Sequence, residues 1–155
     1  MNETIVVRPC TEADPPLLRR REVRQGSDFA ASALRLAQAG DYFFVGAFTD
    51  DDVAGYVALD CRAETELRPE MKSLWVYPEY RRRGLGVQLT RAVEKIAAEQ
   101  GFDEVTLGVD PENPAAIPHS ISLDYTPTGH HRTTADGEGG EQVEAIYRKS
   151  LALLR

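Results

Sequence analysis

The sequence has few cysteines and no long apolar run among its 155 residues. Cys10 and Cys61 have neither the spacing of a metal site nor that of a disulfide framework. No segment approaches the ~18 apolar residues that span a bilayer, and the first ten residues lack the regions of a signal peptide. We therefore expect one domain over residues 1–155, with reduced cysteines, no metal, no membrane partner and a cytoplasmic location.

Basic residues are also scarce, since 18 lysines and arginines face 25 acidic residues, for a net charge of −7. A protein that binds nucleic acid through its phosphates usually has a basic excess. The acidic balance therefore disfavours nucleic acid as a partner, and we expect none. The arginines cluster at Arg19–Arg21 with Arg24, expected to be a solvated helix surface, and at Arg81–Arg83, where a local anion site stays open.

Hydrophobic periodicity predicts alternating strands and helices. The expected strands cover residues 4–8, 42–48, 53–59, 71–76, 104–109, 125–133 and 143–151. The expected helices cover residues 15–25, 29–39 and 85–99, with a shorter one after Asn113. Asp50–Asp52 would form a solvated hairpin turn. The strand, helix and strand between 71 and 109 imply a parallel pair with a right-handed crossover, so we expect a mixed α/β domain with one sheet.

The helix at 85–99 has the clearest amphipathic pattern. Its apolar positions fall on one face, whereas Gln88, Arg91, Glu94 and Lys95 fall on the other. Periodicity therefore predicts that these four side chains face solvent.

The segment just before this helix has the composition of an anion site. Pro78 breaks a strand, the arginine triplet follows, and Gly84 and Gly86 open the helix. The first N–H groups of a helix have no intrahelical partner and carry partial positive charge. Glycines let an anion approach the main chain closely, so the segment predicts a pyrophosphate site. The alternative is a tight strand-to-helix turn with no ligand.

Known phosphate loops can be compared with this segment. The Walker A loop requires Gly-Lys-Ser/Thr, which is missing here. The dinucleotide fingerprint requires glycine or alanine where this chain has Leu89. Both are excluded.

Arg81, Gly84 and Gly86 instead match the acyl-CoA loop Gln/Arg-x-x-Gly-x-Gly/Ala, and here the chain resembles the GNAT N-acetyltransferase superfamily. The resemblance covers nearly the whole chain. It extends to residues 70–81 and to positions Gly101, Phe102, Asn113, Ala116, Leu123 and Tyr125. It implies an α/β (α+β) fold with a mixed, largely antiparallel sheet of six to seven strands. Helices would cover both faces, and the central parallel pair would splay apart.

The resemblance also implies an activity, in which a primary amine attacks the thioester of acetyl-CoA directly. The main chain near Val76 would polarise the thioester carbonyl. The cofactor-binding residues implied in this way are Leu74, Trp75, Val76, Arg81, Arg82, Arg83, Gly84, Leu85, Gly86, Val87 and Asn113.

Two catalytic residues are implied with it. Glu70, at the start of the fourth strand, would accept the proton of the amine. Ser120 stands where the superfamily has the tyrosine that protonates the leaving thiolate, and His119 and Tyr125 are alternatives. Pro118 is expected to distort this helix. Asp124 occupies a position at which the superfamily has glycine.

The serine in place of tyrosine leaves a second class of function open, a non-catalytic acyl-CoA-binding sensor. The sequence does not identify the acceptor substrate. In the superfamily it is chosen by segments that correspond here to residues 14–38 and 134–142. Dimerisation is common among members, and nothing in the sequence specifies an interface.

Overall fold

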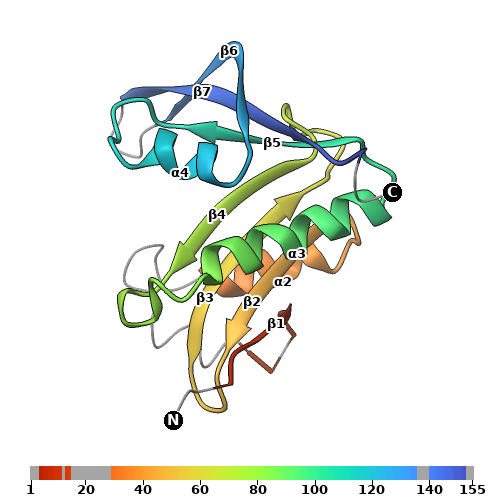
Figure 1. Cartoon of the computed structure of the whole chain (residues 1–155). Coiled ribbons are helices and arrows are strands. Elements are labelled where there is room, and N and C mark those ends of the chain that lie inside the picture. The colour runs from red at the N-terminus through yellow and green to blue at the C-terminus, as the bar shows by residue number, and fades with distance from the viewer. Residues whose placement is uncertain (1–3, 12, 15–28, 136–139, 153–155) are drawn as a thin grey trace.

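The computed structural model describes residues 4–11, 13–14, 29–135 and 140–152 (Figure 1). The expected helix at 15–25 and the arginines within it lie outside these residues. The elements run β1 (Val6–Pro9), α2 (Phe29–Ala37), β2 (Tyr42–Phe48), β3 (Val53–Asp60), β4 (Glu70–Val76), the 3-10 helix η1 (Pro78–Tyr80), α3 (Leu85–Glu99), β5 (Glu104–Val109), α4 (Ala116–Ser122), β6 (Thr126–Ala135) and β7 (Glu141–Ser150). No helix among them is long and apolar enough to cross a membrane.

The strands form one seven-stranded sheet in the order β1-β2-β3-β4-β5-β7-β6. Every neighbouring pair is antiparallel except β4 and β5, which are parallel. These two strands are in register only at Glu70 and Thr106, near their amino ends. Beyond that point they diverge (Figure 1). The expected mixed sheet with a splayed parallel pair is therefore confirmed.

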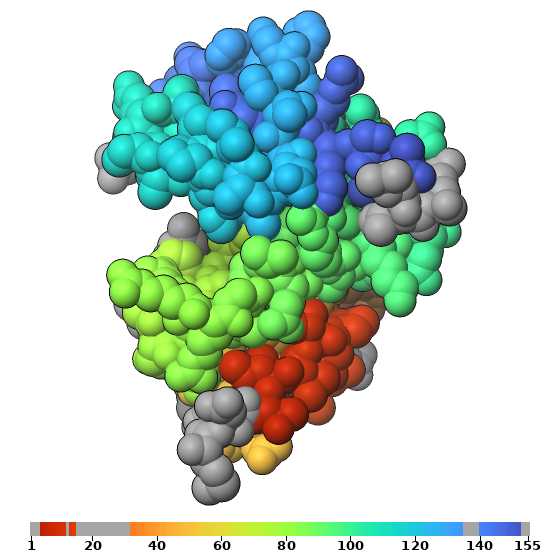
Figure 2. Space-filling view, in the orientation of Figure 1, coloured from red at the N-terminus to blue at the C-terminus, as the bar shows by residue number. Residues whose placement is uncertain are grey.

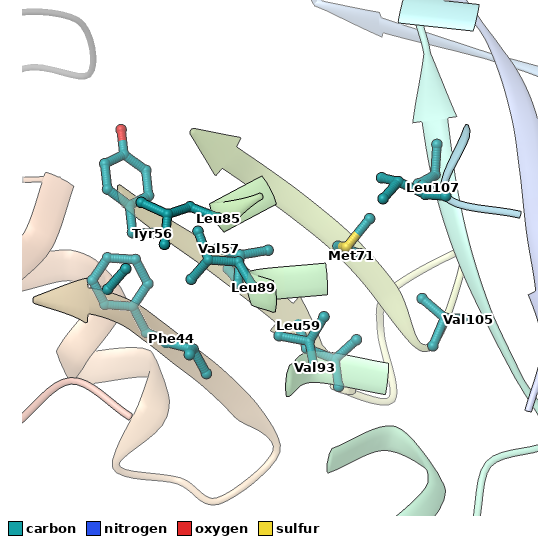
Figure 3. Close-up of a cluster of buried hydrophobic side chains, with 14 of the residues drawn as sticks. Phe44, Tyr56, Val57, Leu59, Met71, Leu85, Leu89, Val93, Val105 and Leu107 are labelled. Atoms are coloured by element: carbon teal, nitrogen blue, oxygen red, sulfur yellow. The ribbon is translucent and has the colours of Figure 1, made fainter. Parts of the chain in front are cut away.

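Helix α3 lies over one face of the sheet, and α2 lies on the opposite face, against β2 (Figure 1). The apolar stripe of α3, with Leu85, Leu89 and Val93, packs on β2, β3 and β4 (Figure 3). Every residue of β3 is buried. Because a close-packed core resists deformation, the start of α3 is held in a fixed place beside the end of β4.

One prediction about α3 is wrong, because Glu94 does not face solvent and is fully buried. Its carboxylate accepts hydrogen bonds from Tyr125 Oη at 2.9 Å, Lys149 Nζ at 2.9 Å and Arg91 Nη1 at 2.8 Å. Burial, and then the adjacent Glu94 carboxylate, raise the pKa of Tyr125. The polar flank of α3 is covered by chain from the other half of the sheet, and buried charge requires such partners.

The expected distortion by Pro118 is also absent. α4 runs through it without interruption, from Ala116 to Ser122. Pro118 lies in the first turn of the helix, where a main-chain N–H would have no intrahelical acceptor in any case. The missing N–H therefore costs no hydrogen bond, and the turn keeps its register.

Candidate active site

A cavity of about 780 Å³ lies where β4 and β5 separate. Figure 2 shows its mouth as a notch between the yellow-green segment that leads into α3 and the cyan segment that includes α4. We call the part lined by Tyr80, Arg81, Arg82, Gly84, Leu85 and Gly86 the loop end. We call the part lined by Met71, Lys72, Leu107, Gly108 and Glu144 the strand end.

The loop end is built from main chain. Gly84 precedes α3 with φ of 76°, in the left-handed region that glycine adopts without strain. No side chain caps the first N–H groups of α3. A Cβ atom at Gly84 would meet nothing within 4 Å, and one at Gly86 would lie 3.8 Å from His119 Cε1. Open space thus faces a helix N-terminus, which fits a diphosphate.

The arginine triplet does not act as one group. Arg81 donates from Nε to the carbonyl of Val76 at 2.9 Å and lies over the Trp75 ring at 4.7 Å. Arg81 and Arg82 line the cavity, as do Leu74, Trp75, Val76, Gly84, Leu85 and Gly86. The lining does not include Arg83, which lies 5.4 Å over the Tyr80 ring, or the exposed Val87.

The edge of β4 that faces the gap is shaped by an irregularity. Ser73 has φ of 61°, and the register against β3 shifts between Tyr56 and Ala58. The N–H of Tyr77 bonds to the carbonyl of Ala54 on β3 at 2.9 Å. Successive residues of a strand direct their N–H groups to opposite edges. The N–H of Val76 is therefore directed toward β5 and into the gap.

The opposite wall comes from α4 and the turn before it. Asn113 lines the cavity, and its Oδ1 accepts from the N–H of Ala115 at 3.0 Å. Ser120 is buried there and donates from Oγ to the carbonyl of Ala116 at 2.9 Å. His119 lines the same wall and is exposed. Tyr125 is bonded to Glu94 in the core instead. Two of the three predicted leaving-group donors therefore lie at the cavity.

Glu70 lies behind the strand end in an ion-pair triad formed by Glu70, Arg132 and Glu144. Both of its oxygens accept from the guanidinium of Arg132, one at 3.3 Å. The other side of that guanidinium donates from Nε to Glu144 Oε1 at 2.8 Å. Sequence reasoning missed Arg132 and Glu144, because β4, β6 and β7 come together only in the fold. Among the described residues, no group of His, Cys, Asp and Glu could hold a metal.

Residues 8–118 match the family model described as Acetyltransferase (GNAT) family. The chain belongs to the GNAT acetyltransferase family. Streptothricin acetyltransferase of Streptomyces lavendulae is 29% identical over 135 residues, which cover 87% of this chain and 70% of that protein.

Solved GNAT structures share the fold. YncA of Salmonella typhimurium, solved with its cofactor acetyl-CoA, has a TM-score of 0.72 at 18% identity and covers 96% of this chain and 94% of its own. An aminoglycoside 6'-N-acetyltransferase complexed with coenzyme A has a TM-score of 0.68 at 15% identity, covering 94% and 97%. Membership of the family makes this chain an acetyltransferase.

Proposed function

We propose that this protein is an acetyl-CoA-dependent N-acetyltransferase that acetylates a primary amine by direct attack. The observation that carries the proposal is the cavity, which places an uncapped helix N-terminus and the Val76 N–H along one continuous surface. The first suits a diphosphate and the second suits the oxygen of a thioester carbonyl. Acetyl-CoA, when bound, supplies an activated acetyl group.

The chain's own residues divide the work. Main-chain N–H groups at Gly84–Gly86, with Arg81 and Arg82, would hold the diphosphate. Leu74–Val76 and Asn113 would hold the pantetheine arm on the two sides of the gap. The N–H of Val76 would strengthen its hydrogen bond as negative charge develops on the carbonyl oxygen, which lowers the barrier to attack.

Proton transfer is the second task, because an amine attacks only when it is neutral. Glu70 as the proton acceptor and Ser120 as the donor to the leaving thiolate stay predictions. Glu70→Gln and Ser120→Ala test them. If the roles hold, each lowers kcat, and neither changes the affinity for coenzyme A. The hydroxyl of Ser120 already donates to Ala116, so its proton must first leave that bond.

The acceptor to test first is streptothricin, since a relative of this chain is named for its acetylation. Thiol release from acetyl-CoA is followed with streptothricin, polyamines, lysine, an aminoglycoside and a peptide N-terminus. Release with at least one amine supports the proposal. Tight binding of coenzyme A with no release for any amine would indicate the sensor function instead. The cytoplasmic location and dimerisation stay predictions.

A further inference from the structure

We propose that Glu144 binds the ammonium group of the acceptor at the strand end, and that Arg132 is the positioning residue for it. This inference rests on the proposed function and names its substrate class, cationic amines. Four observations carry it: the place of Glu144, the charge of its surroundings, the glycine beside it and the ion pair that holds the lysine of the same cavity.

Glu144 lines the cavity on the face of the sheet opposite α4. Side chains alternate along a strand. Leu107 and Val109 of β5 belong to the core that α4 covers, so Gly108 between them points to the other face. Gly108 pairs with Ile146 on β7, two residues from Glu144, which therefore shares that face. Because β4 and β5 have separated here, the carboxylate reaches the same cavity as the loop end.

The triad leaves one carboxylate oxygen of Glu144 available. Arg132 engages both oxygens of Glu70 but only Oε1 of Glu144. Within the described part of the chain, nothing donates to Oε2 of Glu144, and its side chain keeps 20% exposure. Two carboxylates around one guanidinium carry a net charge of −1. One ammonium would neutralise the triad and give Oε2 a charge-assisted hydrogen bond.

Gly108 explains why the carboxylate can lie there. A Cβ atom at this position would be 2.7 Å from Glu144 Oε1 and 3.0 Å from Arg132 Nη2. Any larger residue would push the carboxylate aside. The space that Gly108 leaves on β5 is therefore part of the acceptor site.

The lysine that lines the strand end forms an ion pair with a different carboxylate. Lys72 lines the strand end, but its Nζ lies 2.8 Å from a carboxylate oxygen of the buried Asp60. Asp60 also forms an ion pair with Arg62, whose Nη2 lies 2.8 Å from Asp60 Oδ2. Lys72 is thus held by a separate ion pair with Asp60 and forms none with the triad.

Calorimetric titration of the full chain, saturated with coenzyme A, tests the inference with 1,5-diaminopentane and the neutral 1,5-pentanediol. The parent is expected to bind the diamine about tenfold more tightly than the diol, since a hydrogen bond to a charged group is worth about that factor. Glu144→Gln should reduce this preference to less than twofold. Glu99→Gln, the same charge removal at the exposed end of α3 and outside the segments expected to choose the acceptor, should keep it.

Gly108→Ala is the second variant, because it moves the carboxylate without removing its charge. It should also reduce the preference at least threefold while leaving the affinity for coenzyme A unchanged. Circular dichroism checks that each variant is folded. An unaltered preference in either Glu144→Gln or Gly108→Ala, or no preference in the parent, overturns the inference.

Thiol-release assays separate this inference from the proposed function. If amines release thiol and Glu144→Gln keeps the parent KM, the acetyltransferase assignment stands and the role of Glu144 fails. If no amine releases thiol but the ammonium preference depends on Glu144, the ammonium site is supported and the proposed acetyl transfer to an amine is rejected.

Discussion

The two ends of the cavity are built from different parts of the polypeptide. The loop end is one continuous stretch, and the groups proposed to bind there are main-chain N–H groups beside Gly84 and Gly86. The strand end is assembled from β4, β5 and β7, with charged side chains backed by Arg132 from β6. The first kind of site depends on local backbone shape. The second depends on the whole sheet, so the two ends should respond differently to mutation.

The largest effect is expected from Arg132→Gln at the strand end. It leaves Glu70, which is 5% exposed, and Glu144 without their shared cation. Removing one partner of a buried ion pair costs about 3 kcal/mol. Urea unfolding should show a loss of that size. The double variant Glu70→Gln with Arg132→Gln should recover part of it, and a loss below about 0.5 kcal/mol in the single variant would contradict the triad's structural role.

Gly86→Glu at the loop end should have the reverse pattern. Its carboxylate would enter the space in front of the α3 N-terminus, where it repels a diphosphate. We expect about a hundredfold loss in affinity for coenzyme A, or ~2.7 kcal/mol, with little change in urea unfolding. Gln100→Glu adds the same charge at the exposed far end of α3, and calorimetry should find parent-like affinity there.

Acid should weaken the surroundings of the strand end through Asp60. Burial alone would raise the pKa of this carboxyl, but hydrogen bonds from Arg62 and Lys72 outweigh it and hold the pKa well below its ordinary value. A carboxyl with a depressed folded-state pKa stabilises the fold above the unfolded-state pKa of about 3.9. That stability is lost as pH falls toward the folded-state pKa.

Between pH 7 and pH 3 this loss amounts to about 1 kcal/mol. Asp60→Asn should therefore be less stable than the parent at pH 7 and have a shallower decline in acid. Urea unfolding at several pH values measures both. Glu99→Gln, on the exposed end of α3, should decline in parallel with the parent. If the stability of Asp60→Asn declined with falling pH in parallel with that of the parent, the stabilising role assigned to the Asp60 carboxylate would be refuted.

The smallest effect distinguishes the arginines of the loop. Arg81 lines the cavity and fixes the Val76 carbonyl, whereas Arg83 lies over Tyr80 outside the lining. Arg81→Ala should lower the affinity for coenzyme A about fivefold, as expected for one partly solvated phosphate contact. Arg83→Ala should change it less than twofold. Equal losses in calorimetry would show that the triplet acts as a single charge.

The contrast between the two ends also explains what the sequence could predict. The position of the loop end was predictable because Pro78 ends a strand and Gly84 allows the left-handed turn before α3, both of which are local signals. The ligand of this segment stays a prediction. The hairpin of β2 and β3 and the helix α3 were predicted because their periodicity is strong. Glu94 was misplaced since its partners, Tyr125 and Lys149, are distant in sequence. The triad was missed for the same reason.

One measurement tests the central claim, that main-chain N–H groups at the start of α3 bind the diphosphate of coenzyme A. The 15N-labelled protein is titrated with coenzyme A and, separately, with pantetheine, and its amide resonances are followed by NMR. We predict that coenzyme A shifts the amides of Gly84, Leu85 and Gly86 more than any others, whereas pantetheine leaves them in place and shifts those of Leu74–Val76. Saturable binding of coenzyme A with unmoved Gly84–Gly86 amides would contradict the account.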